Sequence, residues 1–201
     1  MLAILDYKAG NQTSVLRALR SLGIPAEITA DPEVLFSAEG VIFPGVGAAG
    51  QAMNQLTSTG MDKVLREIIA RKKPLLGICL GCQILLERSE ENDVETLGLL
   101  PGICRRFTPA LMGGGQPIRI PHMGWNALEL TKPAKLLENG SYVYFVHSFY
   151  AENCADSIAA ITDYGIPITA AVEKDNIFGC QFHPEKSGNV GLAILKKFCE
   201  V

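Results

Sequence analysis

The stretch "PLLGICLGCQILLE" (residues 74–87) decides how the chain folds. Its apolar start is typical of a buried strand that runs to Cys79, and "GCQILLERSE" from Gly81 onward is predicted to be a helix. Cys79 therefore lies on a sharp turn from strand to helix. The string G-I-C-L-G has the form of a nucleophile elbow, in which Gly77 and Gly81 avoid Cβ clashes within a strained turn.

The segments around this stretch alternate between short apolar runs and amphipathic helices. The runs "LAILDY" (2–7), "PAEITA" (25–30) and "GVIFPG" (40–45) predict strands, and residues 11–23 and 61–73 predict helices. The second half is richer in extended segments, at 117–130, 141–152, 156–165, 167–176 and 177–185, before a helix over 187–201. We therefore expect one α/β domain over residues 1–201. Its sheet should be doubly wound and mostly parallel, with helices on both faces and extra antiparallel strands.

Ligands of such sheets bind at the carboxyl ends of the strands. Three loops are expected there: "DYKAGNQTS" (6–14), "PGVGAAG" (44–50) and "GICLGCQ" (77–83). The stretch "TPALMGGGQ" (108–116) is predicted to be no more than a flexible loop.

Composition excludes several classes of protein. The 201 residues are 48% hydrophobic and 19% charged, so a disordered or fibrous chain is excluded. The net charge is -3 and no basic patch is evident, which argues against nucleic acid as a partner. No apolar run reaches the roughly 18 residues of a membrane span, and the N-terminus does not have the pattern of a signal peptide. Six scattered cysteines then indicate free thiols in the cytoplasm.

Cys79 has the surroundings of a nucleophile. The helix after it should direct N–H groups at the sulfur and favour the thiolate, and the Leu80 N–H should stabilise an oxyanion. A nucleophile of this kind needs a base. His183 lies in an extended segment, where residues two apart share a face, so Glu185 should orient it. A Cys79–His183–Glu185 triad is therefore available if the fold brings these residues together.

Other readings compete with this triad. His122 is more typical of a structural or surface histidine, and the apolar neighbours of His147 favour a satisfied core histidine. Cys79 and Cys82 have C-x-x-C spacing, which also suits a thiol redox pair. A zinc site would need about four ligands, and no second pair is visible, so neither a metal nor a cofactor is predicted. The alternative for Cys82 is a small buried side chain facing the core.

Two motifs resemble known signatures. "GICLGCQ" and "HPE" are similar to those of class I (triad-type) glutamine amidotransferases. The further set "DYKAGNQTSV", "PGVGAAG", "PHMGWN", "YFVHSFY" and "HPEKSG" resembles the glutaminase subunits of imidazole glycerol phosphate synthases in histidine biosynthesis, over nearly the whole chain. A glutaminase of pyridoxal phosphate synthesis or a γ-glutamyl hydrolase remains the alternative on the same scaffold.

The resemblance implies a mechanism and a set of contacts. Cys79 would attack the amide of L-glutamine, His183 would pass the thiol proton to the leaving ammonia, and water would hydrolyse the thioester. Backbone N–H groups of Val46 and Leu80 would form the oxyanion hole, after a rearrangement of the loop that carries Val46. Glutamine contacts are expected from Gly47, Gln83, His147 and Ser148. Phe149 stands where the family usually has tyrosine, which leaves only a backbone contact there.

The resemblance also implies a partner. A barrel-type cyclase subunit would receive the ammonia, and its ligand would stimulate the glutaminase. The candidate interface residues are Asn11, Ser14, Met123, Trp125, Tyr144 and Lys186. Each has a plainer explanation: Asn11 as a helix cap, Lys186 as a solvated charge and Trp125 as core packing, for example.

Overall fold

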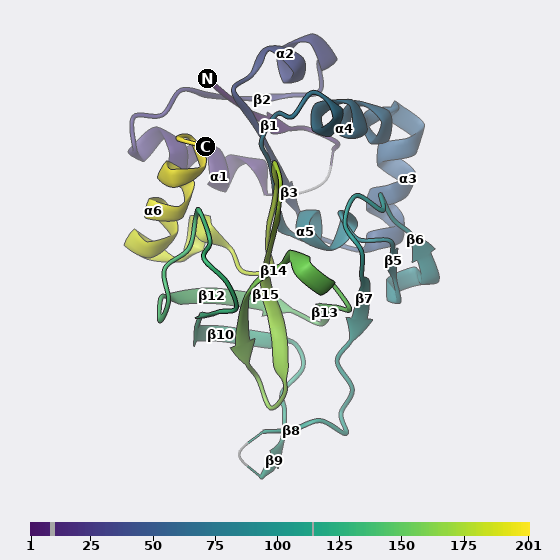
Figure 1. Cartoon of the computed structure of the whole chain (residues 1–201). Helices are drawn as coiled ribbons and strands as arrows, with labels where there is room; N and C mark the ends of the chain where they lie inside the picture. The colour runs from purple at the N-terminus through teal and green to yellow at the C-terminus, as the bar shows by residue number, and fades with distance from the viewer. Residues whose placement is uncertain (9–10, 114) are drawn as a thin grey trace.

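A mixed sheet of twelve strands forms the centre of the protein in the computed structural model, which describes residues 1–8, 11–113 and 115–201 (Figure 1). Five adjacent strands are parallel, in the order β2-β1-β3-β4-β16. They are β1 (Leu2–Leu5), β2 (Ala26–Thr29), β3 (Gly40–Gly45), β4 (Leu75–Cys79) and β16 (Ile177–Cys180). The strands predicted in the first half are confirmed.

Helices cover both faces of this sheet. The helices α1 (Gln12–Ser21) and α6 (Gly188–Phe198) share one hydrophobic cluster with the sheet. The other face carries α2 (Pro32–Ser37), α3 (Ala49–Thr59), α4 (Met61–Ala70) and α5 (Leu80–Ile84). Strand β1 contributes Leu2 and Ile4 to the first cluster and Ala3 and Leu5 to the second. Its continuous apolar sequence thus fits burial on both faces, and the doubly wound α/β class is confirmed.

Antiparallel strands extend the sheet beyond β16. They are β15 (Pro167–Lys174), β13 (Phe149–Glu152), β7 (Ile103–Arg106), β5 (Arg88–Ser89) and β6 (Val94–Glu95), with β14 (Ile158–Asp163) on β15 and β11 (Glu129–Leu130) on β14. Within this part, only β5 and β7 pair in parallel. A separate ribbon pairs β10 (His122–Ala127) with β12 (Tyr142–His147). Short 3-10 helices are η1 (Glu91–Asp93), η2 (Ala155–Ser157) and η3 (Pro184–Lys186).

The helix predicted after Cys79 is much shorter than expected. It ends at Ile84, and the chain turns into β5. The carbonyl of Ile84 accepts the N–H of Leu97, and the carbonyl of Leu85 accepts those of Leu99 and Leu100. These carbonyls are therefore bonded to a distant loop and are not available to continue the helix.

Further segments differ from the sequence prediction, among them α3, which was not expected as a helix. The last extended segment ends at Cys180, and Glu185 lies in η3. The helix α2 was not predicted, although Asp31 caps it through the N–H of Glu33 and a proline follows at its first position. In the predicted loop 108–116, β8 (Met112–Gly113) pairs with β9 (Gln116–Pro117). Gly114 of this loop, and Ala9 and Gly10 of the first strand-end loop, lie outside the described residues.

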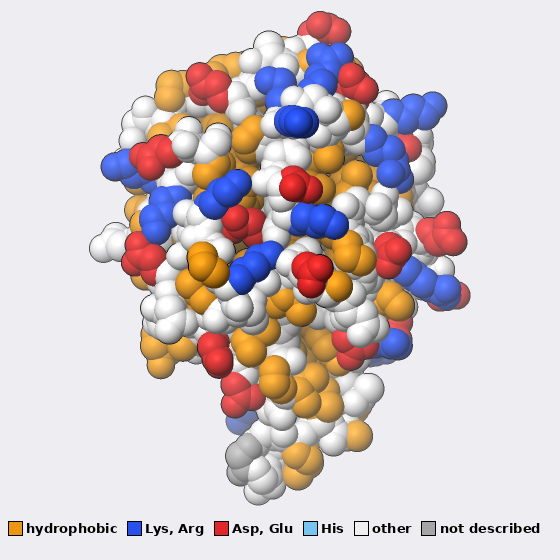
Figure 2. Space-filling model, in the orientation of Figure 1, with side chains coloured by type: hydrophobic (Ala, Val, Ile, Leu, Met, Phe, Trp, Pro, Cys, Tyr) orange, Lys and Arg blue, Asp and Glu red, His pale blue; other side chains and the backbone are white. Residues whose placement is uncertain are grey.

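Charges are mixed over the face of the molecule seen in Figure 2. Lysine and arginine side chains alternate there with acidic ones, and apolar side chains gather toward the end that carries β8 and β9. Among the described residues, no helix is both long enough and apolar enough to span a bilayer.

Candidate active site

Cys79 occupies the strained turn that the sequence predicted. Its φ is 55° and its ψ is -110°, in a region that non-glycine residues rarely adopt. The neighbouring glycines are required by close packing. A Cβ on Gly81 would lie 1.9 Å from the carbonyl oxygen of Phe43, and a Cβ on Gly77 would lie 2.8 Å from the N atom of Cys82. The end of β4 is therefore locked against β3 and the first turn of α5.

The turn opens into a cavity of about 690 Å³ at the carboxyl ends of the parallel strands. The structure brings Cys79 and His183 together there with every residue that the resemblance proposed for glutamine. Those that line the cavity are Val46, Gly47, Leu80, Gln83, His147 and Ser148, with Phe149 beside them. Of the three strand-end loops, 44–50 and 77–83 thus contribute to the cavity.

His183 is placed between Cys79 and Glu185. Its Nδ1 lies 2.9 Å from Glu185 Oε1, and the two side chains are 3% and 1% exposed. Burial lowers the pKa of His183, but hydrogen bonds and charges from Cys79 and Glu185 outweigh it and raise that pKa from 6.5 to about 9. Because Nδ1 faces the carboxylate, Nε2 is the ring nitrogen left for the sulfur. The imidazolium is therefore the favoured form of His183 in this site.

The other two histidines bond to each other. His122 Nδ1 and His147 Nε2 are 2.9 Å apart, His147 Nδ1 donates to the carbonyl of Phe149 at 2.7 Å, and His122 Nε2 contacts Asn126 Oδ1. Burial lowers the pKa of His122, and it lowers that of His147 to about 3. His122 is buried, so a surface position is wrong for it. Both ring nitrogens of His147 are engaged, so its ring nitrogens are not free for a substrate.

The side chain of Gln83 is held inside the protein. Its Nε2 donates to the carbonyl of Phe149 at 3.0 Å and to Gln181 Oε1 at 3.0 Å, which leaves its own Oε1 for other contacts. Gln181, in turn, points its Nε2 at the sulfur of Cys79 at 3.7 Å. Gln181 was not among the site residues predicted from the sequence.

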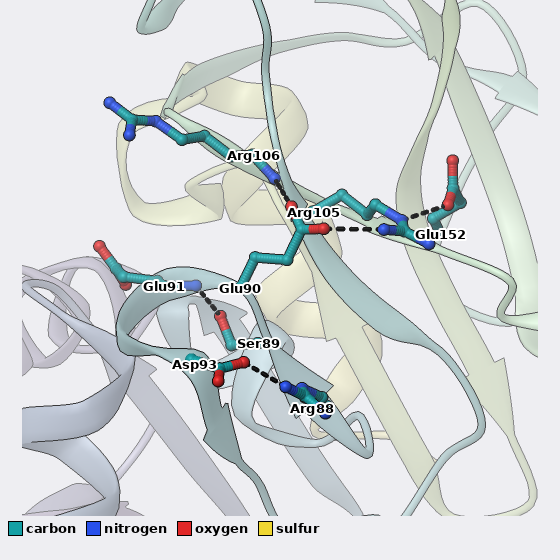
Figure 3. A network of polar contacts seen from close by, with 8 residues as sticks. All are labelled: Arg88, Ser89, Glu90, Glu91, Asp93, Arg105, Arg106 and Glu152. Atoms are coloured by element: carbon teal, nitrogen blue, oxygen red, sulfur yellow. Dashed lines mark hydrogen bonds and ion pairs between the residues drawn. The ribbon is translucent and has the colours of Figure 1, made fainter.

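Five residues of the cavity wall were also missed from the sequence: Val146 of β12, and Glu90, Glu91, Asn92 and Arg106. Glu90 precedes η1, Glu91 and Asn92 lie in it, and Arg106 ends β7. A network of ion pairs and hydrogen bonds links these two segments (Figure 3). The carboxylate of Glu90 accepts the backbone N–H of Arg106 at 2.8 Å and Nη1 of Arg105 at 2.7 Å, and Arg105 Nε donates to Glu152. The guanidinium of Arg106 points away from this network (Figure 3).

The loop that carries Val46 is anchored by η1. Ala48 precedes α3 and provides no side-chain cap. Instead, Glu91 Oε2 accepts the N–H of Ala49 at 2.7 Å, and Asn92 Oδ1 accepts that of Gly50 at 3.2 Å. The first turn of α3 is therefore capped from another segment.

The candidate interface residues lie in three places: the β10–β12 ribbon, η3 and the start of α1. Met123 and Trp125 are 61% and 52% exposed on β10, and the Trp125 ring packs edge-on against Tyr144 of β12 at 5.9 Å. Core packing of Trp125 is thus wrong. Lys186 is exposed at the cavity mouth. Ser14 Oγ donates to Asn11 Oδ1 at 2.8 Å, and Asn11 makes no capping bond with its side chain.

Cys82 faces the core. It is 2% exposed, and a Cβ added to Gly179 would lie only 2.6 Å from its sulfur. Burial raises the pKa of its thiol well above the ordinary value. All six cysteines are free. These features suit a packed core thiol and not a redox partner of Cys79.

The fold and the site define a class of enzyme. A model of class-I glutamine amidotransferases matches residues 3–201, so the chain belongs to the class-I glutamine amidotransferase family. A curated relative from Desulfovibrio desulfuricans, named imidazole glycerol phosphate synthase subunit HisH, is 56% identical over 100% of this chain and 94% of its own length. A relative of the same name from Streptococcus sanguinis is 47% identical, over 100% of this chain and 96% of its own.

Solved structures agree in fold. One described as a glutamine amidotransferase has a TM-score of 0.75 at 20% identity, over 100% of this chain and 99% of its own. A putative GMP synthase subunit from Thermoplasma acidophilum has a TM-score of 0.72 at 20% identity, over 99% and 92%. At this identity the likeness concerns the fold alone.

Proposed function

We propose that the chain hydrolyses L-glutamine to glutamate and ammonia through a thioester on Cys79, as the glutaminase subunit of an imidazole glycerol phosphate synthase in the cytoplasm. The observation that carries the proposal is the contact of buried His183 with both Cys79 and Glu185, where Cys79 and His183 line the cavity. The names of the relatives support the pathway.

The first half of the reaction forms the thioester. The thiolate of Cys79 attacks the side-chain carbonyl carbon of glutamine, and the oxyanion receives the N–H groups of Leu80 and Val46. His183 gives its Nε2 proton to the amide nitrogen as the C–N bond breaks, and ammonia leaves. Glu185 holds the imidazolium in orientation throughout.

The second half releases glutamate. His183, now neutral, takes a proton from water as the water attacks the thioester carbonyl. The C–S bond breaks, glutamate forms and the thiolate of Cys79 returns opposite an imidazolium. The groups that would hold the substrate are the cavity residues Gly47, Gln83 and Ser148, and the backbone of His147 and Phe149.

The ammonia would pass to a barrel-type cyclase subunit in a heterodimer, which makes imidazole glycerol phosphate and aminoimidazole carboxamide ribotide. An exposed tryptophan next to an exposed methionine supports an interface on the β10–β12 ribbon, because such side chains are enriched at the centre of interfaces. We place Asn11, Ser14, Tyr144 and Lys186 on the same interface.

Glutaminase assays test the proposal. The chain alone should hydrolyse glutamine poorly, and the cyclase subunit with its nucleotide ligand should raise turnover. Cys79→Ala should abolish activity in the complex, while Cys82→Ala should keep it. Strong activity without a partner would contradict the subunit assignment, and equal loss in both variants would favour the paired-cysteine interpretation.

A further inference from the structure

A second polar side chain besides His183 reaches the sulfur of Cys79. Gln181 is 1% exposed and directs its Nε2 at the sulfur over 3.7 Å, a length suited to the large sulfur atom. Gln181 does not line the cavity, whereas Cys79 does. A molecule in the cavity would therefore meet the sulfur without touching this amide.

The orientation of the Gln181 amide follows from a chain of donors. A backbone carbonyl can only accept, so the nitrogen of Gln83 must face the Phe149 carbonyl. The same nitrogen donates its second proton to Gln181, which must present its oxygen there. The remaining end of the Gln181 amide is its NH₂, and this end faces Cys79. These hydrogen bonds thus determine that the NH₂ group of Gln181, a donor, and not its oxygen, an acceptor, lies beside the sulfur.

The backbone explains why Gln181 can take this place. Gln181 and Phe182 lie in bends after β16, and His183 has an extended backbone conformation, and this path brings the side chains of both Gln181 and His183 to Cys79. Gly179, two residues before Gln181, lies against Cys82 of α5. Cys180 lies on the opposite face, in the cluster of α1 and α6. The N–H of Gln181 also donates to the carbonyl of Ala170 at 2.9 Å, which anchors this position to β15.

We propose that Gln181 is a further catalytic residue, whose amide N–H stabilises the thiolate of Cys79 before attack and again as it leaves the thioester. The proposal rests on the proposed function, since it needs Cys79 as the nucleophile. No proton moves between the two groups: the amide stays neutral and donates a hydrogen bond to a charge. A donor to a charged acceptor in a buried site is among the stronger hydrogen bonds. Gln83 is then a positioning residue that keeps the donor aimed.

The test compares Gln181→Met with Gln181→Glu in the complex with the cyclase subunit. Methionine keeps the length of the side chain without a donor, and glutamate keeps the shape but opposes the thiolate with a charge. Gln181→Met should lower kcat about tenfold with KM little changed, because the amide does not line the cavity. Gln181→Glu should lower it further. Cys180→Ala, on the opposite face of the same segment, is the matched control and should keep kcat.

A second readout follows the sulfur directly. Iodoacetamide reacts with the thiolate, so its rate with Cys79 against pH reports how readily the thiolate forms. In Gln181→Met the acidic limb of this profile should move to higher pH, by about fivefold in proton concentration. A variant that is folded and has the wild-type profile and the wild-type kcat would overturn the role of Gln181. Failure of the proposed function itself would give a different result, because Cys79→Ala would then retain full glutaminase activity.

Discussion

Replacing Glu185 by glutamine removes one charge from the site with little change of shape. Glu185 Oε1 accepts from His183 Nδ1, and a glutamine oxygen can accept the same proton, so the tautomer of the imidazole is kept. Glu185 Oε2 has no hydrogen-bond partner among the described residues. The NH₂ group of the glutamine would take the place of this oxygen, so no hydrogen bond between described residues is lost. The variant therefore tests charge and not geometry.

The raised pKa of His183 sets the magnitude. A pKa of about 9 instead of 6.5 corresponds to about 3 kcal/mol in favour of the imidazolium, against the cost of burial. This stabilisation is complete below pH 6.5 and is lost as the pH rises through about 9. Cys79 and Glu185 share it, so losing the charge of Glu185 should remove about 1 to 2 kcal/mol of it. The pKa of His183 then falls by about one pH unit.

The assay is the pH dependence of kcat/KM for glutamine in the complex with the cyclase subunit. The wild-type profile should fall on the alkaline side near pH 9, and that of Glu185→Gln should fall about one pH unit lower, with kcat reduced about tenfold. Glu138→Gln is a control, because Glu138 is an exposed carboxylate paired with Lys197. An alkaline limb at the same pH in wild type and Glu185→Gln would refute the role given to this charge.

Three further predictions concern the elbow, the helix cap and the interface. Gly81→Ala should lose about 3 kcal/mol of unfolding free energy in a urea titration, since its Cβ meets the carbonyl oxygen of Phe43; an unchanged midpoint would contradict this. Glu91→Ala should lower kcat about tenfold by uncapping α3, and Glu91→Gln should restore most of it by keeping an acceptor; equal losses would argue for a charge contact instead. Trp125→Ala should weaken cyclase binding about 30-fold in calorimetry and leave alkylation of Cys79 in the free chain unchanged, and an unchanged Kd would remove it from the interface.

The sequence predicts the elbow well because its causes are local. A buried strand, two glycines and a helix start within a few residues define the conformation of Cys79 without distant contacts. The parallel strands are likewise visible as continuous apolar runs, because both of their faces are buried. The length of α5 was not predictable, since it depends on the N–H groups of Leu97, Leu99 and Leu100, which a later loop directs at the carbonyls of Ile84 and Leu85.

The neighbours of His183 show the limit of a period-two argument. Glu185 does contact the imidazole of His183, as predicted. The predicted extended conformation is wrong, however, because Pro184–Lys186 forms a 3-10 helix. Gln181, two residues before His183, also reaches Cys79, through a bent segment that a period-two pattern does not describe. The part of the cavity wall that contains Glu91 and Arg106 depends on the pairing of β5 with β7. It could not be predicted, because strands of two and four residues give no clear local pattern.

Trapping the covalent intermediate would show directly whether Cys79 is the nucleophile. The chain in complex with the cyclase subunit and its nucleotide ligand is mixed with glutamine, quenched in acid, digested and analysed by mass spectrometry. We predict a glutamyl group in thioester linkage on the peptide that contains Cys79, and none on that peptide in Cys79→Ala. Glutamine hydrolysis that proceeds in Cys79→Ala, or a glutamyl group on Cys82 instead, would contradict the account.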